Sequence, residues 1–215
     1  MPAPALQHLM FDIDGTLLES CVFDGQCFDE AVMAVTGIAL HANRRLYKHV
    51  SDEGILRQHV QEHALAHGEE VISKIKRVFV ENIRKHLEQQ PAVEIAGAQH
   101  LLEQLRQEQN ISLSLATGGW QETALLKLNS AGIDISDLAL ASSNDHYQRT
   151  EIMKLARQRA AIDSSVPITY VGDGAWDKQA SDELSWNFIL RGRALEHHQR
   201  LDDLRDVQRF MSFLF

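Results

Sequence analysis

Two aspartates one residue apart, Asp12 and Asp14, lie at the end of the first apolar run of the chain, Leu9–Ile13. The run has the length of a buried strand, and the letters DIDGT at positions 12–16 place both carboxylates where that strand becomes a loop. In an open parallel sheet the carboxyl ends of the strands are where ligands bind, and Gly15 lets the chain turn away sharply. An Asp-Gly turn is common without any function, but the whole string is more specific than a turn requires.

A second acidic strand end repeats this arrangement. Asp173 follows the apolar run Ile168–Val171, and Asp177 comes four residues later. If Asp173 shares the edge of the sheet with Asp12, the carboxylates repel one another unless a divalent cation neutralises them. Mg²⁺ suits such a site because it takes few carboxylates and keeps room for water and phosphate oxygens. A polar loop cap explains one such loop, but two acidic strand ends in one sheet favour the metal site.

A small polar turn, Thr117-Gly118-Gly119, follows a third apolar run, Ile111–Ala116. A hydroxyl and successive backbone N–H groups at a strand-to-helix turn can hold a phosphate oxygen. Taken alone this signal is weak, since Thr-Gly is also a routine turn.

A phosphoryl transfer needs a cation to balance the anionic nucleophile and the transferred group. After the apolar run Leu138–Ala141 the candidates are Arg149 and Lys154. Arg149 comes directly before a predicted helix, whereas Lys154 lies one turn inside it, where a solvated helix face is an ordinary position for lysine.

The elements that must position these side chains alternate between strand and helix. The four apolar runs, together with a weaker one at Asn187–Leu190, are separated in the second half of the chain by helical patterns. Strands that alternate with helices predict a doubly wound parallel sheet. The predicted helices of this part are Gln99–Gln107, Gln121–Ser130 and Glu151–Ala161.

The stretch between the first two strands, roughly Leu18 to Gln90, has helical periodicity and no convincing strand. It is far longer than one crossover connection needs, so we interpret it as an inserted helical subdomain. Its predicted helices are Phe28–Thr36, Glu53–Ala66 and Glu70–Gln89.

Composition narrows the class of protein. The chain has 215 residues and a net charge of −9, so it gains little from the counterion release that drives nucleic-acid binding, and we expect no nucleic-acid partner. No apolar run approaches the length of a membrane span, and the N-terminus lacks a signal-peptide pattern. Cys21 and Cys27 match no redox or zinc spacing and are interpreted as reduced thiols. We expect a cytoplasmic protein that is a monomer or a homodimer.

These motifs, in this order, resemble the haloacid dehalogenase-like (HAD) superfamily, and specifically its phosphatases with a phosphoglycolate-phosphatase-like helical cap. The resemblance covers essentially the whole chain. It implies an α/β fold with a doubly wound, Rossmann-like core, residues 1–17 and 92–215, and an inserted α-helical cap, residues 18–91. It also implies a Mg²⁺-dependent enzyme whose substrate is a small phosphorylated metabolite.

The resemblance assigns roles to individual residues. Asp12 would be the nucleophile that forms an aspartyl-phosphate, Asp14 the general acid/base, and Thr117 the phosphate-binding hydroxyl. The Lys-Pro that usually forms the third motif is absent; we favour Arg149 in its place, with Lys154 as the alternative. The implied metal ligands are Asp12, the backbone carbonyl of Asp14, Asp173 and Asp177, and the implied phosphate contacts include Gly118 and Gly119.

The same residues argue for or against the other activities of the superfamily. Dehalogenases lack the second aspartate, so Asp14 argues against them, and phosphonatases need a Schiff-base lysine, for which Lys48 is the only comparable residue. A sugar phosphomutase keeps both aspartates and stays open. A receiver domain has no such insertion, and a non-catalytic phosphometabolite-binding protein would be expected to lose Asp12, Asp14 or Asp173.

The cap would choose the substrate by closing over the site. Arg45 and Lys48 are the predicted substrate contacts, with Arg44 and Ser51 as further candidates, although a solvated polar face explains each as well. Three histidines at a spacing of four also lie in the insertion, and we interpret them as a solvated or substrate-facing stripe rather than a second metal site, because no carboxylate pattern accompanies them. They are His59, His63 and His67.

Overall fold

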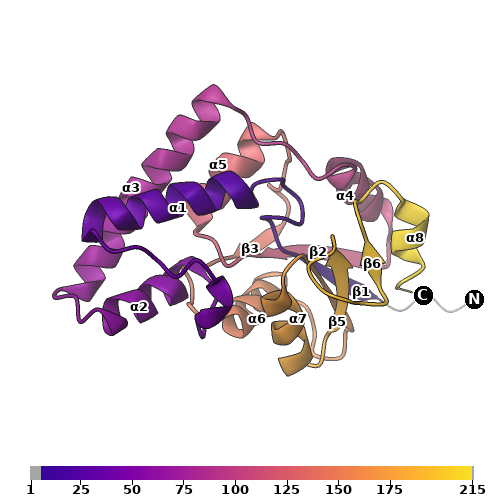
Figure 1. Cartoon of the computed structure of the whole chain (residues 1–215). Helices are drawn as coiled ribbons and strands as arrows, with labels where there is room; N and C mark the ends of the chain where they lie inside the picture. The colour runs from indigo at the N-terminus through magenta and orange to yellow at the C-terminus, as the bar shows by residue number, and fades with distance from the viewer. Residues whose placement is uncertain (1–5, 215) are drawn as a thin grey trace, which may run out of the picture.

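A six-stranded parallel sheet forms the centre of the molecule (Figure 1). The computed structural model describes residues 6–214, and in it the strands lie in the order β3-β2-β1-β4-β5-β6. The strand order reverses between β1 and β4, which is the position where doubly wound sheets bind ligands. The strands are β1 (Gln7–Phe11), β2 (Ile111–Ala116), β3 (Ala139–Ala141), β4 (Ile168–Gly172), β5 (Asn187–Arg191) and β6 (Arg200–Leu201).

Helices cover both faces of this sheet, so the side chains of its central strands β1 and β4 are buried in both directions. In β1, Leu9 and Phe11 pack on one side with α4, α5 and α8, whereas Met10 packs on the other side with α6 and α7. All three side chains are wholly buried. The helices of this part are α4 (Ala98–Gln107), α5 (Gln121–Ser130), α6 (Arg149–Arg159), α7 (Ala175–Glu183) and α8 (Val207–Met211).

The insertion after β1 is helical and has an apolar cluster of its own. Phe28, Ile75 and Phe79 belong to it, and Trp120, from the turn before α5, enters it from the sheet side. In Figure 1 the long helices α1 and α3 lie beyond the end of the sheet rather than on either of its faces. The insertion consists of α1 (Cys21–Thr36), the 3₁₀ turn η1 (Arg44–Leu46), α2 (Asp52–Glu62) and α3 (Gly68–Gln89).

Two linkers join the insertion to the sheet domain, and they run side by side. The N–H of Glu19 donates to the carbonyl of Val93 at 2.9 Å, and the N–H of Ile95 donates to the carbonyl of Leu17 at 2.8 Å. This pairing agrees with the expected boundaries near residues 17 and 92, which remain a prediction.

The predicted fold class is confirmed, and the differences are local. Helix α1 begins at Cys21, seven residues before the predicted start at Phe28, because Gly25 is accommodated inside the helix. The helix predicted for 53–66 ends at Glu62. Strand β6 and helices α7 and α8 were not predicted, since each is short and weakly patterned.

The histidine stripe does not exist as one helical face. Ala64 and His67 have left-handed φ values of 48° and 56°, which break the helix between α2 and α3. His59 is buried, and its ring packs edge-on against that of His63 with centroids 4.7 Å apart. The prediction of one solvated or substrate-facing helical stripe is therefore wrong. No helix within residues 6–214 is long and apolar enough to cross a membrane.

Candidate active site

A cavity of about 300 Å³ lies at the carboxyl edge of the sheet. The strand register brings its lining residues level: Phe11 of β1 pairs with Leu115 of β2 and with Val171 of β4. The polar residues that follow each strand therefore meet at one place. From the sheet domain the cavity is lined by Asp12, Asp14, Thr117, Gly118, Gly119, Arg149, Asp173 and Trp176.

Three carboxylates at this edge form a group that could hold a metal ion. One oxygen from each of Asp12, Asp173 and Asp177 lies within 4.8 Å of the others, and this is the one such group among the described residues. Burial, followed by repulsion from Asp177, raises the pKa of Asp12 well above its usual value. The same two causes raise the pKa of Asp173 to about 7. Crowded, buried carboxylates of this kind fit a hard divalent cation such as Mg²⁺.

Asp177 also orders the loop that carries Asp173. Its Oδ2 accepts the backbone N–H of Asp173 at 3.2 Å and that of Gly174 at 2.9 Å. The side chain is completely buried. These two hydrogen bonds to Asp177 fix the backbone of the loop after β4 and so orient Asp173 toward the cavity.

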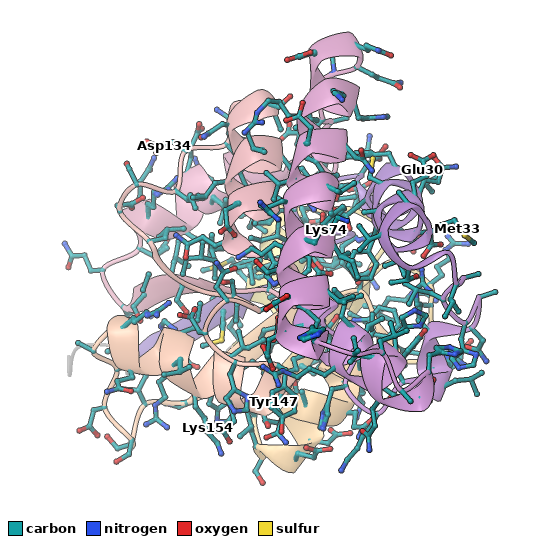
Figure 2. All side chains as sticks on the ribbon, turned by 90° about the vertical axis from the view of Figure 1, so that its left-hand side faces the viewer. Glu30, Met33, Lys74, Asp134, Tyr147 and Lys154 are labelled. Atoms are coloured by element: carbon teal, nitrogen blue, oxygen red, sulfur yellow. The ribbon has the colours of Figure 1, made fainter. Side chains whose placement is uncertain are left out.

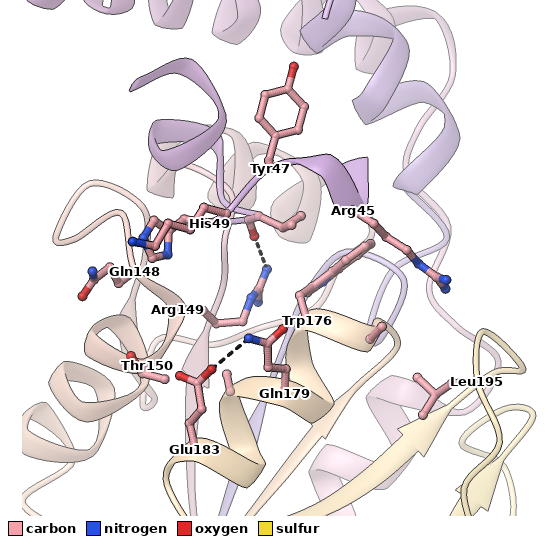
Figure 3. A pocket seen from close by; sticks show the side chains of 14 residues that line it. Arg45, Tyr47, His49, Gln148, Arg149, Thr150, Trp176, Gln179, Glu183 and Leu195 are labelled. Carbon is pink, nitrogen blue, oxygen red and sulfur yellow. Dashed lines mark hydrogen bonds between the residues drawn. The ribbon is translucent and has the colours of Figure 1, made fainter. Parts of the chain in front are cut away.

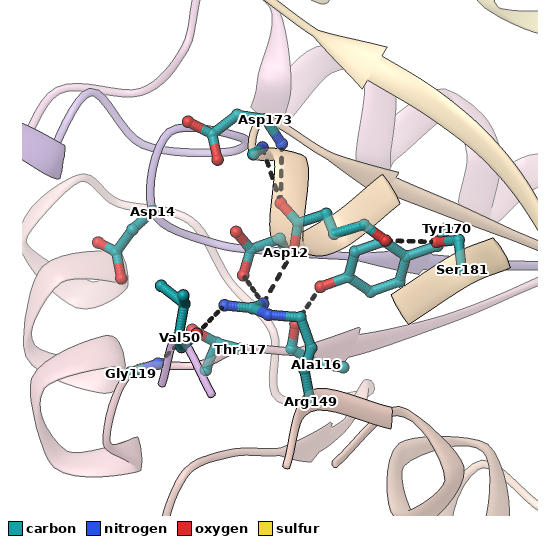
Figure 4. Close-up of polar contacts among 12 residues, drawn as sticks. Asp12, Asp14, Val50, Ala116, Thr117, Gly119, Arg149, Tyr170, Asp173 and Ser181 are labelled. Atoms are coloured by element: carbon teal, nitrogen blue, oxygen red, sulfur yellow. Dashed lines mark hydrogen bonds and ion pairs between the residues drawn. The ribbon is translucent and has the colours of Figure 1, made fainter. Parts of the chain in front are cut away.

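Arg149, the first residue of α6, brings the cation into this cluster (Figure 4). Its Nη1 lies 2.9 Å from Oδ1 of Asp177 and 3.7 Å from Oδ1 of Asp12. Its Nη2 donates to the carbonyl of Val50 in the insertion at 3.0 Å. A side chain at position 118 would collide with the guanidinium in this position, so Gly118 leaves room for it.

Lys154 does not reach the site. Its side chain is 53% exposed and its Nζ pairs with Glu151 on the same helix at 2.8 Å. Figure 2 shows it on the outside of the molecule. Five residues after Arg149, it leaves α6 on a different face, so the predicted substrate contact from Lys154 is wrong.

The turn after β2 is built to present donors. The hydroxyl oxygen of Thr117 accepts the N–H of Gly119 at 3.0 Å, which leaves the hydroxyl hydrogen for another partner. Within residues 6–214 neither the N–H of Gly118 nor that of Asp14 has a hydrogen-bond partner. Phosphoryl oxygens accept hydrogen bonds from such free N–H groups.

Asp14 lines the same cavity, but its side chain is turned away from Asp12 toward helix α5 (Figure 4). Its Oδ1 is 2.5 Å from Nζ of Lys127, and the hydroxyl of Ser20 donates to the same oxygen. Sequence reasoning missed Lys127. The signal was a lone lysine on an apolar stripe, three residues after Ala124.

The family model described as haloacid dehalogenase-like hydrolase matches residues 9–190. The chain belongs to the haloacid dehalogenase-like hydrolases. The resemblance inferred from the motifs, and with it the prediction of an enzyme of this family, is confirmed. A search of curated proteins gave no match.

Solved HAD structures share the fold over nearly the whole chain at low sequence identity. A hydrolase from Pseudomonas syringae has a TM-score of 0.77 and 18% identity, with 97% of this chain and 99% of that one covered. CbbY from Rhodobacter sphaeroides, in complex with phosphate, has a TM-score of 0.73 and 17% identity, with 94% of this chain and 96% of that one covered. The β-phosphoglucomutase from Clostridium difficile has a TM-score of 0.71 and 14% identity, with 97% of this chain and 99% of that one covered.

The insertion of this HAD chain is docked onto the turn that follows β2. The N–H of Asp52 donates to the carbonyl of Gly118 at 2.8 Å, and the Asp52 carboxylate accepts the N–H of Trp120 at 2.9 Å. The hydroxyl of Ser51 donates to the carbonyl of Tyr147 at 2.6 Å. These contacts close the cavity from the cap side, where the lining residues are Cys21, Asp24, Gly25, Phe28, Arg44, Val50, Ser51, Asp52 and Ile55.

Arg45 and Lys48 lie beside this cavity rather than in it. They line a neighbouring cavity of about 630 Å³ (Figure 3). Val50, Arg149 and Trp176 line both cavities and stand between them. The predicted contacts of Arg45 and Lys48 with a substrate at Asp12 are therefore not supported by their positions; Arg44, from the same segment, is the cap arginine that lines the site.

Proposed function

We propose that this HAD hydrolase is a Mg²⁺-dependent phosphatase that hydrolyses a small phosphomonoester through an aspartyl-phosphate at Asp12. The observation that carries the proposal is the meeting of Asp12 with Thr117, Arg149 and Asp173 in one cavity, at the point where the strand order reverses. A buried carboxylate, a guanidinium and free N–H donors around one small space match the needs of phosphoryl transfer.

The first half of the reaction forms the covalent intermediate. A carboxylate oxygen of Asp12 attacks phosphorus in line, a new P–O bond forms, and the bond to the ester oxygen breaks. Asp14 gives its proton to the leaving oxygen as that bond breaks. Thr117, the free N–H groups of Asp14 and Gly118, and Arg149 bind the phosphoryl oxygens, and these donors offset the negative charge that develops there.

In the second half water releases phosphate. Asp14, now a carboxylate, takes a proton from the water that attacks phosphorus, and the bond to Asp12 breaks. Asp12, the carbonyl of Asp14, and Asp173 would hold Mg²⁺, with Asp177 completing the acidic cluster. When bound, the cation offsets the repulsion between the nucleophile and the phosphate dianion.

The volume of the cavity and its lining on the cap side indicate the class of substrate. About 300 Å³ is at the small end of the range for small-molecule sites, which favours a small leaving group. Phe28 and Ile55 offer apolar contact, while the carboxyl groups of Asp24 and Asp52 are hydrogen-bonding partners for hydroxyl groups. We therefore expect a sugar or polyol phosphate to be a better substrate than phosphoglycolate or a nucleoside monophosphate.

The test is phosphate release from a panel of phosphomonoesters in the presence of Mg²⁺. The wild type should turn over one or more of them, and both chelation of the metal and Asp12→Asn should abolish the reaction, because the amide cannot attack phosphorus. Release that survives in Asp12→Asn would reject the aspartyl-phosphate route. A protein that binds phosphometabolites without turning any over would be a binding protein instead.

A sugar phosphomutase of the same superfamily remains the alternative, since the β-phosphoglucomutase from Clostridium difficile shares this fold. Asp12 and Asp14 serve both activities. Isomerisation of a sugar phosphate when a sugar bisphosphate primer is supplied, with little free phosphate, would favour the mutase.

A further inference from the structure

One fully buried cation takes no part in the chemistry described so far. Lys127 lies in the middle of α5 and its side chain has no exposed surface. Ala124 and Leu128, on the same side of the helix, are also wholly buried in the core. Removing an ammonium group from water is costly, and a buried cation persists only where close anions compensate it.

The compensation for Lys127 comes from two different parts of the molecule. Its Nζ lies 2.5 Å from Oδ1 of Asp14, at the edge of the sheet, and it also donates to Oδ1 of Asp24, in cap helix α1. These two carboxylates outweigh the effect of burial and raise the pKa of Lys127 above its usual value. The side chain of Lys127 therefore links the core to the cap.

The two oxygens of Asp14 differ as a result. Oδ1 accepts from both Lys127 and Ser20. Oδ2 has no hydrogen-bond partner among the described residues, and it lies 3.4 Å from where a side chain at Gly119, in the phosphate-binding turn, would begin. A carboxyl group held by one oxygen presents the other in a fixed direction, and a fixed direction is what efficient proton transfer requires.

We propose that Lys127 is a positioning residue for Asp14. It fixes Oδ1, so that Oδ2 is the oxygen that gives a proton to the leaving group and later takes one from water. Through Asp24, the same ammonium links this arrangement to the docked position of helix α1. The inference rests on the proposed phosphatase function.

The experiment uses two substrates that differ in their need for an acid. Glycerol 3-phosphate expels a strongly basic alkoxide, whereas p-nitrophenyl phosphate expels a weakly basic phenolate that needs little protonation. We expect Lys127→Met to lower kcat/KM about 100-fold for the alkyl ester and less than about 10-fold for the aryl ester, the range of general acid catalysis. Asp14→Asn should show the same contrast, and adding Lys127→Met to it should cost little more.

Lys76→Met is the matched control, because Lys76 also spans cap and core, through Glu122 and Trp120, without contacting Asp14. It should change both substrates alike. If Lys127→Met leaves too many buried anions to fold, the same comparison is made between Asp24→Asn and the double variant Asp24→Asn/Lys127→Met.

The outcomes separate the two claims. Equal losses for the two esters in folded Lys127 variants would show a merely structural lysine and overturn the inference while leaving the phosphatase intact. A wild type that hydrolyses neither ester, nor any other phosphomonoester, would overturn the proposed function and this inference with it.

Discussion

The position of a single guanidinium supports Arg149, rather than Lys154, as the proposed motif cation. Arg149 stands where the superfamily usually has a lysine before a proline, and its planar head reaches Asp12, Asp177 and the carbonyl of Val50 at once. A lysine ammonium is a compact point charge and would not span these partners in the same way. Arg149 therefore also links the acidic cluster to the cap, through the carbonyl of Val50.

Replacing this arginine should be far more damaging than replacing its sequence rival. Arg149→Met leaves the buried carboxylates of Asp12 and Asp177 without their cation, a loss of about 3–5 kcal/mol in the free energy of unfolding, and should lower phosphatase kcat/KM at least about 100-fold. Lys154→Met should change stability by less than about 0.5 kcal/mol and leave turnover intact. Denaturant melts and steady-state kinetics of both variants check this; similar losses in the two would contradict the assignment.

At the scale of elements, the first turn of α2 joins the cap to the core. Ser51 caps this helix, since its oxygen accepts the N–H of Gly54 at 3.1 Å while its hydroxyl donates to the carbonyl of Tyr147. The backbone N–H of Asp52 donates to the carbonyl of Gly118, and that of Glu53 donates to the hydroxyl oxygen of Ser143. The segment that closes the cavity is thus the same one that starts the helix.

Ser51→Ala should loosen closure without touching the reacting groups. Loss of the cap costs about 1 kcal/mol of stability, and loss of the bond to Tyr147 favours the open cap. We expect KM to rise severalfold with kcat changed less than about twofold, because the docked form still contains every group that acts on phosphorus. Ser165→Ala, on an exposed loop, is the control. A fall in kcat at unchanged KM would argue against a role in closure.

At the scale of the whole molecule, the sheet was predictable because its strands are buried on both faces. Ile111–Ala116 and Ile168–Val171 could be recognised as short, mostly apolar runs between turn residues. The two-residue strand β6 and the five-residue helix α8 could not, since pairing with β5 and packing on the core, rather than local sequence, stabilise them.

Some residues of the candidate site could likewise be predicted from the sequence, and others could not. Asp12, Thr117 and Asp173 follow strands directly, so the parallel register alone brings them together. Lys127 and Asp52 meet the site only through the packing of α5 and α2, which periodicity does not determine. Arg44, Arg45 and Lys48 were all candidate contacts from the cap, and of these three Arg44 is the one that lines the site.

The last prediction concerns how cap and core are held together as one unit. Trp120 follows the turn after β2, yet its ring packs in the cap cluster, with its centroid 6.0 Å from those of Phe28 and Phe79. It is 1% exposed. Trp120→Ala should therefore cost about 3–5 kcal/mol and act mainly on docking of the cap. Measured by hydrogen exchange, α1 and α3 should lose protection while β1 and β4 keep theirs.

Phe210→Ala is the matched comparison, because Phe210 is equally buried but lies in the core cluster, stacked near Phe11 with centroids 6.0 Å apart. Phe210→Ala should lower the protection of the sheet as well as that of the cap, because the cap cannot dock on an unfolded core. If both variants lost protection uniformly along the chain, cap and core would unfold as one cooperative unit. The packing of Trp120 between them would then be as stable as the core itself.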